Sequence, residues 1–226
     1  EAVFAVNPNI VLVVMSGRPL VLTWADQHVP AIVQAWHLGH EAGHAITSVL
    51  TGAANPSGKL PMTFPRSVGQ IPIYYNHLNT GRPGPRKEVF WSHYTDESNA
   101  PLYPFGHGLS YTKFDYSKLR ARVRGDAVEV SVRVRNVGAR AGQEVVQLYL
   151  KDRVSSVSRP VRELKGFKKI ALAPGKAQTV SFILTGKELG YYNGHGEFVV
   201  EAGAFDVFAG GSSAADLTTN FDFPGR

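Results

Sequence analysis

The chain has 226 residues, of which 43% are hydrophobic, 19% charged and 11% aromatic, and its formal net charge is +6. This composition is typical of a folded protein rather than a disordered one, and the length suits one large domain or two small ones. The absence of cysteine excludes disulfides, thiolate metal sites and cysteine nucleophiles. No run of about 18 apolar residues occurs, so we expect no membrane-spanning helix and no membrane partner. Because the chain begins at Glu1 without an initiator Met, we expect a processed or truncated piece of a longer protein.

Net charge and residue pattern both change near residue 114. Residues 1–112 contain six basic and six acidic residues, whereas the remainder contains 18 basic and 12 acidic residues and carries the whole net charge of +6. The first part mixes apolar runs with Pro- and Gly-rich loops, and the second part alternates apolar and polar residues. We therefore predict two domains, residues 1–113 and residues 114–226.

In the first part, two short apolar runs predict buried strands. Residues 9–15 and 31–36 do not alternate with polar residues, as is typical of strands covered on both faces of a parallel sheet. Residues 19–26 lie between the two runs and predict a short crossover packed on the sheet. Residues 42–50 carry an apolar stripe at helical spacing that ends at Gly52, and we expect this helix to cover one face of the sheet.

The helix begins within a literal H-E-x-x-H motif, His40 to His44. In zinc proteases the two His of this motif bind the metal and the Glu acts as general base. A third ligand is missing here, because Thr47 and Leu50 stand where the extended motif requires Gly and His, and Gly43 weakens the helix. We favour the interpretation that both His are polar fillers, and we expect no metal and no cofactor.

An edge element and a long aromatic loop follow. Residues 59–64 are expected at a sheet edge, since Pro61 and Pro65 are unsuited to a central strand. The loop of residues 76–103 has no helical or strand period, and its polar side chains lie among aromatic ones: Arg82, Glu88, His93, Tyr94, Asp96 and Glu97. Arginine, carboxylates and aromatic faces bind sugars well. Equally, these groups could satisfy the backbone of an irregular loop, and residue types alone leave both interpretations open.

Strict alternation of apolar and polar residues characterises the second part. Residues 119–124 and 128–135, joined by Gly125-Asp126, predict an antiparallel hairpin with one buried face. Together with the further candidate strands at 145–150, 162–171, 178–184, 197–200 and 204–209, they predict an immunoglobulin-like β-sandwich of about seven strands.

Five arginines alternate along this hairpin: Arg120, Arg122, Arg124, Arg133 and Arg135. They could form a nucleic-acid stripe. A half-buried hairpin needs an outward face, however, and Glu129 shares that face. We therefore favour a solvated face and expect no nucleic-acid partner.

Four longer stretches carry a family resemblance: residues 55–66 (NPSGKLPMTFPR), 75–83 (YNHLNTGRP), 101–112 (PLYPFGHGLSYT) and 158–167 (SRPVRELKGF). They resemble the C-terminal third of glycoside hydrolase family 3, of the bacterial periplasmic β-glucosidase type. In that family a barrel domain precedes an α/β sandwich domain and a fibronectin type III-like domain. The resemblance implies an α/β plus all-β fold, in which a truncated α/β sandwich with a parallel sheet is followed by a fibronectin type III-like β-sandwich.

The resemblance also implies a function. Retaining glycosidases need two carboxyl groups about 5 Å apart, and the positions that supply them in the family lie upstream of Glu1. No catalytic residue is therefore expected in this chain, which alone should be inactive; its place is the C-terminal portion of a retaining exo-acting β-glucosidase-type hydrolase. Arg82, His93 and Tyr94 are expected to rim the sugar pocket and bind substrate.

The resemblance also sets expectations for partners and location. The expected partners are a β-linked glucoside or oligosaccharide and the upstream barrel domain, with a homodimer possible, in a periplasmic or secreted protein. The alternative interpretation is a non-enzymatic module that binds carbohydrate or another protein.

Overall fold

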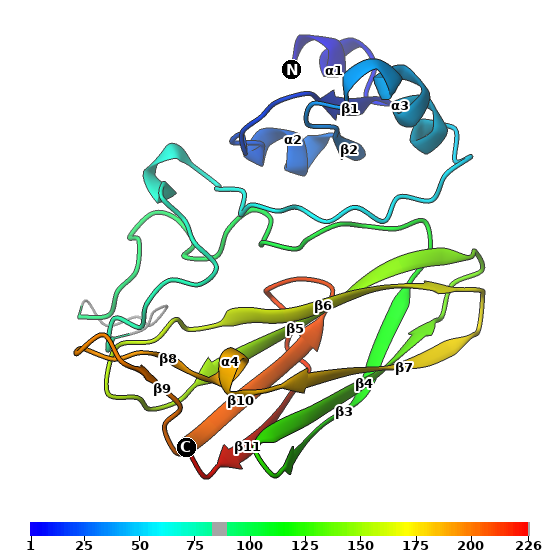
Figure 1. Ribbon diagram of the computed structural model, residues 1–226. Helices are drawn as coiled ribbons and strands as arrows, with labels where there is room; N and C mark the ends of the chain where they lie inside the picture. The colour runs from blue at the N-terminus through cyan, green and yellow to red at the C-terminus, as the bar shows by residue number, and fades with distance from the viewer. Residues whose placement is uncertain (83–89, 226) are drawn as a thin grey trace.

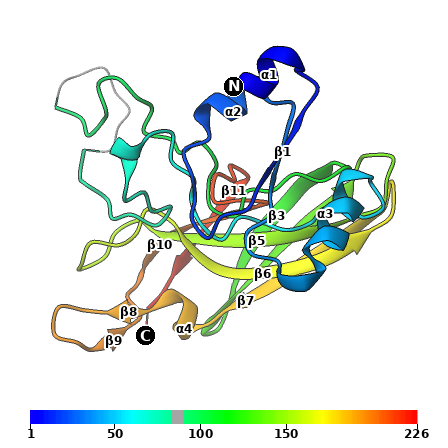
Figure 2. The same cartoon turned by 90° about the horizontal axis from the view of Figure 1, so that it is seen from above.

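The computed structural model describes residues 1–82 and 90–225. Figures 1 and 2 show a small group of N-terminal elements on one side of a β-sandwich, next to the sheet that holds β5 and β6. The N-terminal elements are α1 (Ala2–Val6), β1 (Val11–Val14), α2 (Thr23–His28), β2 (Ala31–Gln34), the 3-10 turns η1 (Gly39–Glu41) and η2 (Val68–Gln70), and α3 (Ala42–Leu50). None of the helices within the described residues has the length and apolar character needed to cross a bilayer.

The two predicted strands of the N-terminal part are present and parallel. β1 pairs with β2 from Val11 opposite Ala31 to Val14 opposite Gln34, and α2 occupies the predicted crossover. Both strands are shorter than predicted. β2 ends before Trp36, whose φ of 52° places it in the left-handed region, which a continuing strand cannot adopt.

Helix α3 has the predicted bounds, but its apolar stripe is less buried than expected for a helix that covers one face of the sheet. It ends before Gly52, whose φ of +76° suits the residue after a helix. No residue of α3 is buried; Ile46 and Val49 on the apolar stripe are half-buried, and Leu50 is exposed. The stripe is therefore only partly covered by the described residues.

The predicted edge element at residues 59–64 is wrong as a strand. Phe64 makes an isolated antiparallel bridge with Tyr103, and Leu60 donates its N–H to the carbonyl of His107 at 2.8 Å. Pro61 has no N–H to continue such a ladder, so the pairing stays irregular. Its partner is not the parallel sheet but residues 102–107.

The second part is the predicted β-sandwich, with antiparallel pairing throughout (Figure 1). One sheet has the strand order β11-β10-β5-β6 and the other the order β3-β4-β7, and a short β8-β9 pair lies outside both. The elements are β3 (Phe114–Arg124), β4 (Ala127–Asn136), β5 (Gly142–Asp152), β6 (Glu163–Leu172), β7 (Ala177–Leu184), α4 (Gly186–Leu189), β8 (Tyr191–Tyr192), β9 (Phe198–Val199), β10 (Gly203–Gly210) and β11 (Thr218–Phe223).

Two of these strands depart from the sequence prediction. The candidate strand 197–200 shrinks to the two residues of β9, and β11 was not predicted. Its inward side chains are Phe221 and Phe223, which are buried, whereas its first half, Thr218 to Asn220, has no apolar residue. Only half of β11 therefore carries the alternating signal.

Alternation along β4 explains both the core and the arginine face. Val128, Val130, Val132 and Val134 are fully buried between the sheets, and each such side chain contributes about 1.5–3 kcal/mol to folding. The intervening residues point outward. The five arginines of β3 and β4 are all exposed, and Arg122 lies opposite Glu129. The solvated face is therefore confirmed; the expected absence of a nucleic-acid partner stays a prediction.

The unpaired edge of β1 leads us to expect that the chain self-associates. Its outer edge has no partner strand within the described residues, and Val11 and Met15 beside it are 49% and 58% exposed. Unpaired strand edges pair with other chains, so we expect concentration-dependent dimers or aggregates in sedimentation velocity. Val11→Lys should reduce them, because a charged edge resists pairing. A chain that stays monomeric at high concentration, with the edge amides of β1 protected from hydrogen exchange, contradicts this expectation.

Candidate functional site

The predicted site residues Arg82, His93 and Tyr94 lie on the loop beyond η2, and a backbone hydrogen bond joins Arg82 to Ser92, the residue before His93. The N–H of Ser92 donates to the carbonyl of Arg82 at 3.0 Å. Nδ1 of His93 lies 2.7 Å from the carbonyl of Trp91. The Tyr94 side chain is 43% exposed, and its hydroxyl lies 3.5 Å from the carbonyl of Gly69. No hydrogen bond, ion pair or ring contact joins the three side chains within the described residues, so their shared role stays a prediction.

Other residues that the sequence analysis did not single out hold this loop in place. Asn99 accepts the N–H of Tyr94 at 3.0 Å and donates to the carbonyl of Ser92 at 2.8 Å. Gln70 is buried and donates to the carbonyl of Ser98 at 2.7 Å. A buried amide needs hydrogen-bond partners, and loop carbonyls supply them here. Of the candidate carboxylates, Asp96 is exposed and Glu97 half-buried, and Glu88 lies outside the described residues.

The H-E-x-x-H motif spans the junction of two short elements. His40 lies on η1 and His44 on α3, and both are exposed. Among residues 1–82 and 90–225, no three His, Cys, Asp or Glu side chains gather as a metal site would require. The expectation that neither His binds zinc stays a prediction.

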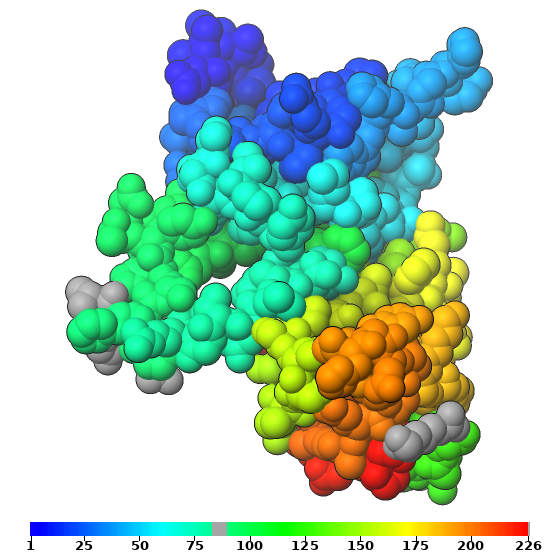
Figure 3. Space-filling view, turned by 60° about the vertical axis from the view of Figure 1, so that its left-hand side comes forward, coloured from blue at the N-terminus to red at the C-terminus, as the bar shows by residue number. Residues whose placement is uncertain are grey.

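Residues 101–112, here called the connecting segment, bind the N-terminal part. The Tyr111 hydroxyl donates to the carbonyl of Val49 at 2.7 Å, and Ser110 Oγ donates to Asn55 Oδ1 at 2.9 Å. Asn55 lies in the turn after α3. Figure 3 shows the cyan and green portions of the chain as a layer between the blue N-terminal elements and the sandwich.

The connecting segment also binds the sandwich. Gln147 on β5, which is buried, donates to the carbonyl of Gly106 at 3.1 Å. The Thr112 hydroxyl donates to Oδ1 of the buried Asn136 at 2.7 Å. One segment therefore holds both parts of the chain, and the division into residues 1–113 and 114–226 stays a prediction.

An ion pair is buried beside the connecting segment. Lys59 Nζ lies 3.1 Å from Glu144 Oε1 and donates to the carbonyl of Gly108 at 2.9 Å. The Tyr116 hydroxyl donates to the same carboxylate oxygen at 2.8 Å. Burial, followed by the charge and hydrogen bond of Glu144, raises the pKa of Tyr116 far above its usual value. This cluster joins the N-terminal part, β3 and β5.

A second polar cluster lies within the N-terminal part. The Tyr103 hydroxyl donates to Asp26 Oδ1 at 2.7 Å, and its ring stacks on His107 with centroids 5.2 Å apart. Burial, together with Asp26, raises the pKa of Tyr103. Burial also lowers the pKa of His107; Lys59 adds to this, and Asp26 opposes it. The cluster favours a neutral phenol beside a neutral imidazole.

The raised tyrosine pKa values predict a loss of stability at alkaline pH. A group whose pKa is higher in the folded than in the unfolded state stabilises the fold fully below the unfolded value, about 10 for tyrosine, and progressively less as pH rises above it. Chemical denaturation at pH 8 to 11 should therefore show a falling free energy of unfolding. Tyr116→Phe should make the fall shallower, whereas the exposed control Tyr192→Phe should leave it unchanged. Equal pH slopes in the two variants contradict the assignment.

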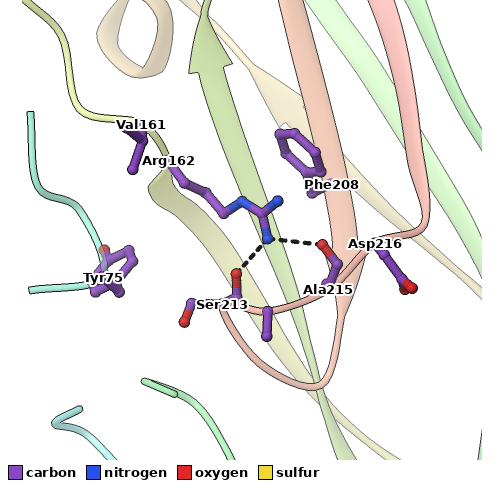
Figure 4. A pocket seen from close by; sticks show the side chains of 8 residues that line it. Tyr75, Val161, Arg162, Phe208, Ser213, Ala215 and Asp216 are labelled. Carbon is purple, nitrogen blue, oxygen red and sulfur yellow. Dashed lines mark hydrogen bonds between the residues drawn. The ribbon is translucent and has the colours of Figure 1, made fainter. Parts of the chain in front are cut away.

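A hollow of about 490 Å³ lies where Tyr75 of the N-terminal part meets loops of the sandwich (Figure 4). It is lined by Tyr75, Val161, Arg162, Phe208 and residues 213–216. The Tyr75 ring stacks on Phe105 with centroids 4.4 Å apart. None of the predicted site residues lines this hollow.

Comparison with known proteins agrees with this architecture. The Glycosyl hydrolase family 3 C-terminal domain matches residues 1–111, and the Fibronectin type III-like domain matches residues 144–213. The chain belongs to glycoside hydrolase family 3. This confirms the family resemblance found in the sequence. It also confirms the predicted fold, a truncated α/β sandwich followed by a fibronectin type III-like β-sandwich.

This chain is similar to several beta-glucosidases, all of them much longer than 226 residues. The periplasmic beta-glucosidase of Salmonella typhimurium is 51% identical and covers 98% of this chain. The thermostable beta-glucosidase B of Acetivibrio thermocellus is 43% identical over 94% of the chain. The crystal structure of a beta-glucosidase from Listeria innocua in complex with glucose superposes with a TM-score of 0.93 at 42% identity, and covers 99% of this chain and 32% of its own. The chain spans only 30% and 29% of the two curated relatives.

Proposed function

We propose that this chain is the C-terminal portion of a retaining exo-acting β-glucosidase-type hydrolase that acts on β-linked glucosides or oligosaccharides. The observation that carries the proposal is the 51% identity, over 98% of the chain, to a periplasmic beta-glucosidase. That relative also supports a periplasmic or secreted location. The two catalytic carboxylates belong to the remaining length of such a protein, so the role of this chain is to complete and support the active site.

Two described carboxylates near the connecting segment are consistent with this proposal. Glu144 is held by Lys59 and Tyr116, and Asp26 accepts from Tyr103. A retaining mechanism needs one carboxylate free to attack and one to exchange a proton. Glu144 is instead committed to joining the N-terminal part to the sandwich, and Asp26 to a contact within the N-terminal part.

A chimera tests the proposal. This chain replaces the matching C-terminal part of the Salmonella relative, and hydrolysis of an aryl β-glucoside is measured for the chimera and for the 226-residue chain alone. We expect the chimera to turn over substrate and the chain alone to be inactive, since both steps need the carboxylates that it lacks. A folded but inactive chimera, or genuine turnover by the isolated chain, would falsify the proposal.

Within such a chimera, Arg82, His93 and Tyr94 are proposed to rim the sugar pocket. Arg82→Ala and Tyr94→Ala should each change kcat/KM more than about tenfold, or roughly 1.4 kcal/mol of transition-state binding. The melting temperature should move little, because an exposed loop residue makes few core contacts. His195→Ala, on the distant turn between β8 and β9, serves as the control. If both loop variants keep the kinetics of the parent, the loop only connects the two parts.

A further inference from the structure

The hollow beside Tyr75 is lined by none of the residues proposed to bind substrate, Arg82, His93 and Tyr94. It is formed by Tyr75 from the N-terminal part, by Arg162 just before β6, and by Phe208 with residues 213–216 from β10 and the β10–β11 loop (Figure 4). Ligand sites are commonly concave, of about 300–1,000 Å³, and located where two parts of a protein meet. This hollow, at about 490 Å³, has both properties.

The walls of the hollow are held by contacts within the protein. Arg162 Nη1 donates to the carbonyls of Ser213 and Ala215, and its guanidinium carbon lies 3.8 Å from the centre of the Phe208 ring. The N–H of Ser213 donates to the carbonyl of Phe105 at 2.8 Å. The loop and the arginine are therefore fixed before any ligand arrives, which lowers the entropic cost of binding.

Polar groups on these walls keep unused hydrogen-bonding capacity. Nε and Nη2 of Arg162 make no hydrogen bond within the described residues. Neither atom is among the buried polar atoms that lack a partner, so both can be reached from the surface. The hydroxyl of Ser213 and the carboxylate of Asp216 likewise have no hydrogen-bond partner within the described part of the chain. The hollow thus offers donors, an acceptor carboxylate and a hydroxyl beside aromatic rings.

We propose that this hollow binds a neutral saccharide of one or two hexose units. Sugar hydroxyls both donate and accept hydrogen bonds, which matches a lining that contains the donors of Arg162 and the acceptors of Asp216 and Ser213. The C–H faces of a pyranose ring are apolar and match the Tyr75 ring. The Arg162 guanidinium and the Asp216 carboxylate interact electrostatically and offset each other's charge, which favours a neutral ligand over an anionic one. This proposal does not rest on hydrolysis.

Titration of the full 226-residue chain with cellobiose, followed by amide NMR shifts, tests the proposal. We expect saturable binding with Kd on the order of 1 mM, with shifts at Tyr75, Arg162 and residues 213–216. Asp216→Ala should weaken binding about tenfold, because it removes a charged hydrogen-bond acceptor. Asp222→Ala, an Asp-to-Ala change at another exposed position, on β11, should bind like the parent.

Folding is checked by the dispersion of the NMR spectrum of each variant. Arg162 anchors the β10–β11 loop, so Ser213→Ala serves as the second variant and should also weaken binding. The proposal is overturned by a folded chain that shows no saturable shifts, by equal affinities of Asp216→Ala and Asp222→Ala, or by glucuronate binding more tightly than cellobiose. An active chimera whose hollow fails these tests overturns only this proposal and leaves the hydrolase assignment intact.

Discussion

Replacing Glu144 with Ala is expected to lower the free energy of unfolding by about 3–5 kcal/mol, because it leaves the Lys59 ammonium buried without its counter-charge. The Lys59 and Glu144 side chains are only 13% and 6% exposed, and their charged atoms lie 3.1 Å apart. The variant also removes the acceptor of the Tyr116 hydroxyl. Urea denaturation followed by tryptophan fluorescence measures the loss.

An exposed ion pair supplies the matched control. Arg153 and Asp206 lie 2.6 Å apart, with side chains 46% and 21% exposed, so Asp206→Ala should cost about 1 kcal/mol or less. The double variant Lys59→Met/Glu144→Leu should regain much of the loss, since no uncompensated charge remains. If Glu144→Ala costs no more than Asp206→Ala, the buried pair does not hold the two parts together as described.

Replacing Gly106 with Ala is expected to cost about 2–5 kcal/mol, from left-handed strain of about 1–2 kcal/mol and a disrupted buried amide of about 1–3 kcal/mol. The φ of Gly106 is +80°, and an added Cβ would lie 2.1 Å from Gln147 Oε1. Gln147 would have to move, although its amide donates to the carbonyls of Gly106 and Gly211. The connecting segment would then lose its contact with β5.

The control for Gly106→Ala is Gly125→Ala at the β3–β4 turn. Gly125 also has a positive φ, +60°, but an added Cβ there meets nothing within 4 Å. Gly125→Ala should therefore cost only the backbone strain of about 1–2 kcal/mol. Melting temperatures and urea midpoints of both variants decide between the two contributions. Equal losses would show that Gln147 adjusts without cost.

Local patterns in the sequence were sufficient to predict the secondary structure of much of this protein. Alternation along β4 placed four valines in the core and the arginines outside, because a strand presents successive side chains to opposite faces. Two apolar runs predicted the parallel pair β1 and β2. Of the stretches that carry the family resemblance, residues 101–112 are the connecting segment and residues 55–66 form hydrogen bonds to it.

Tertiary structure alone decided the contacts on which stability and the binding proposals depend. Lys59 meets Glu144, and Tyr75 meets residues 213–216 around one hollow, although the members of each pair lie far apart in the chain. No periodicity encodes such pairings, because they arise from the path of irregular segments whose prolines and glycines interrupt the backbone ladder. The sequence therefore determined which residues form strands and which face the core. How the connecting segment joins the two parts was decided by long-range packing, since only the folded chain brings its buried polar partners within hydrogen-bonding distance.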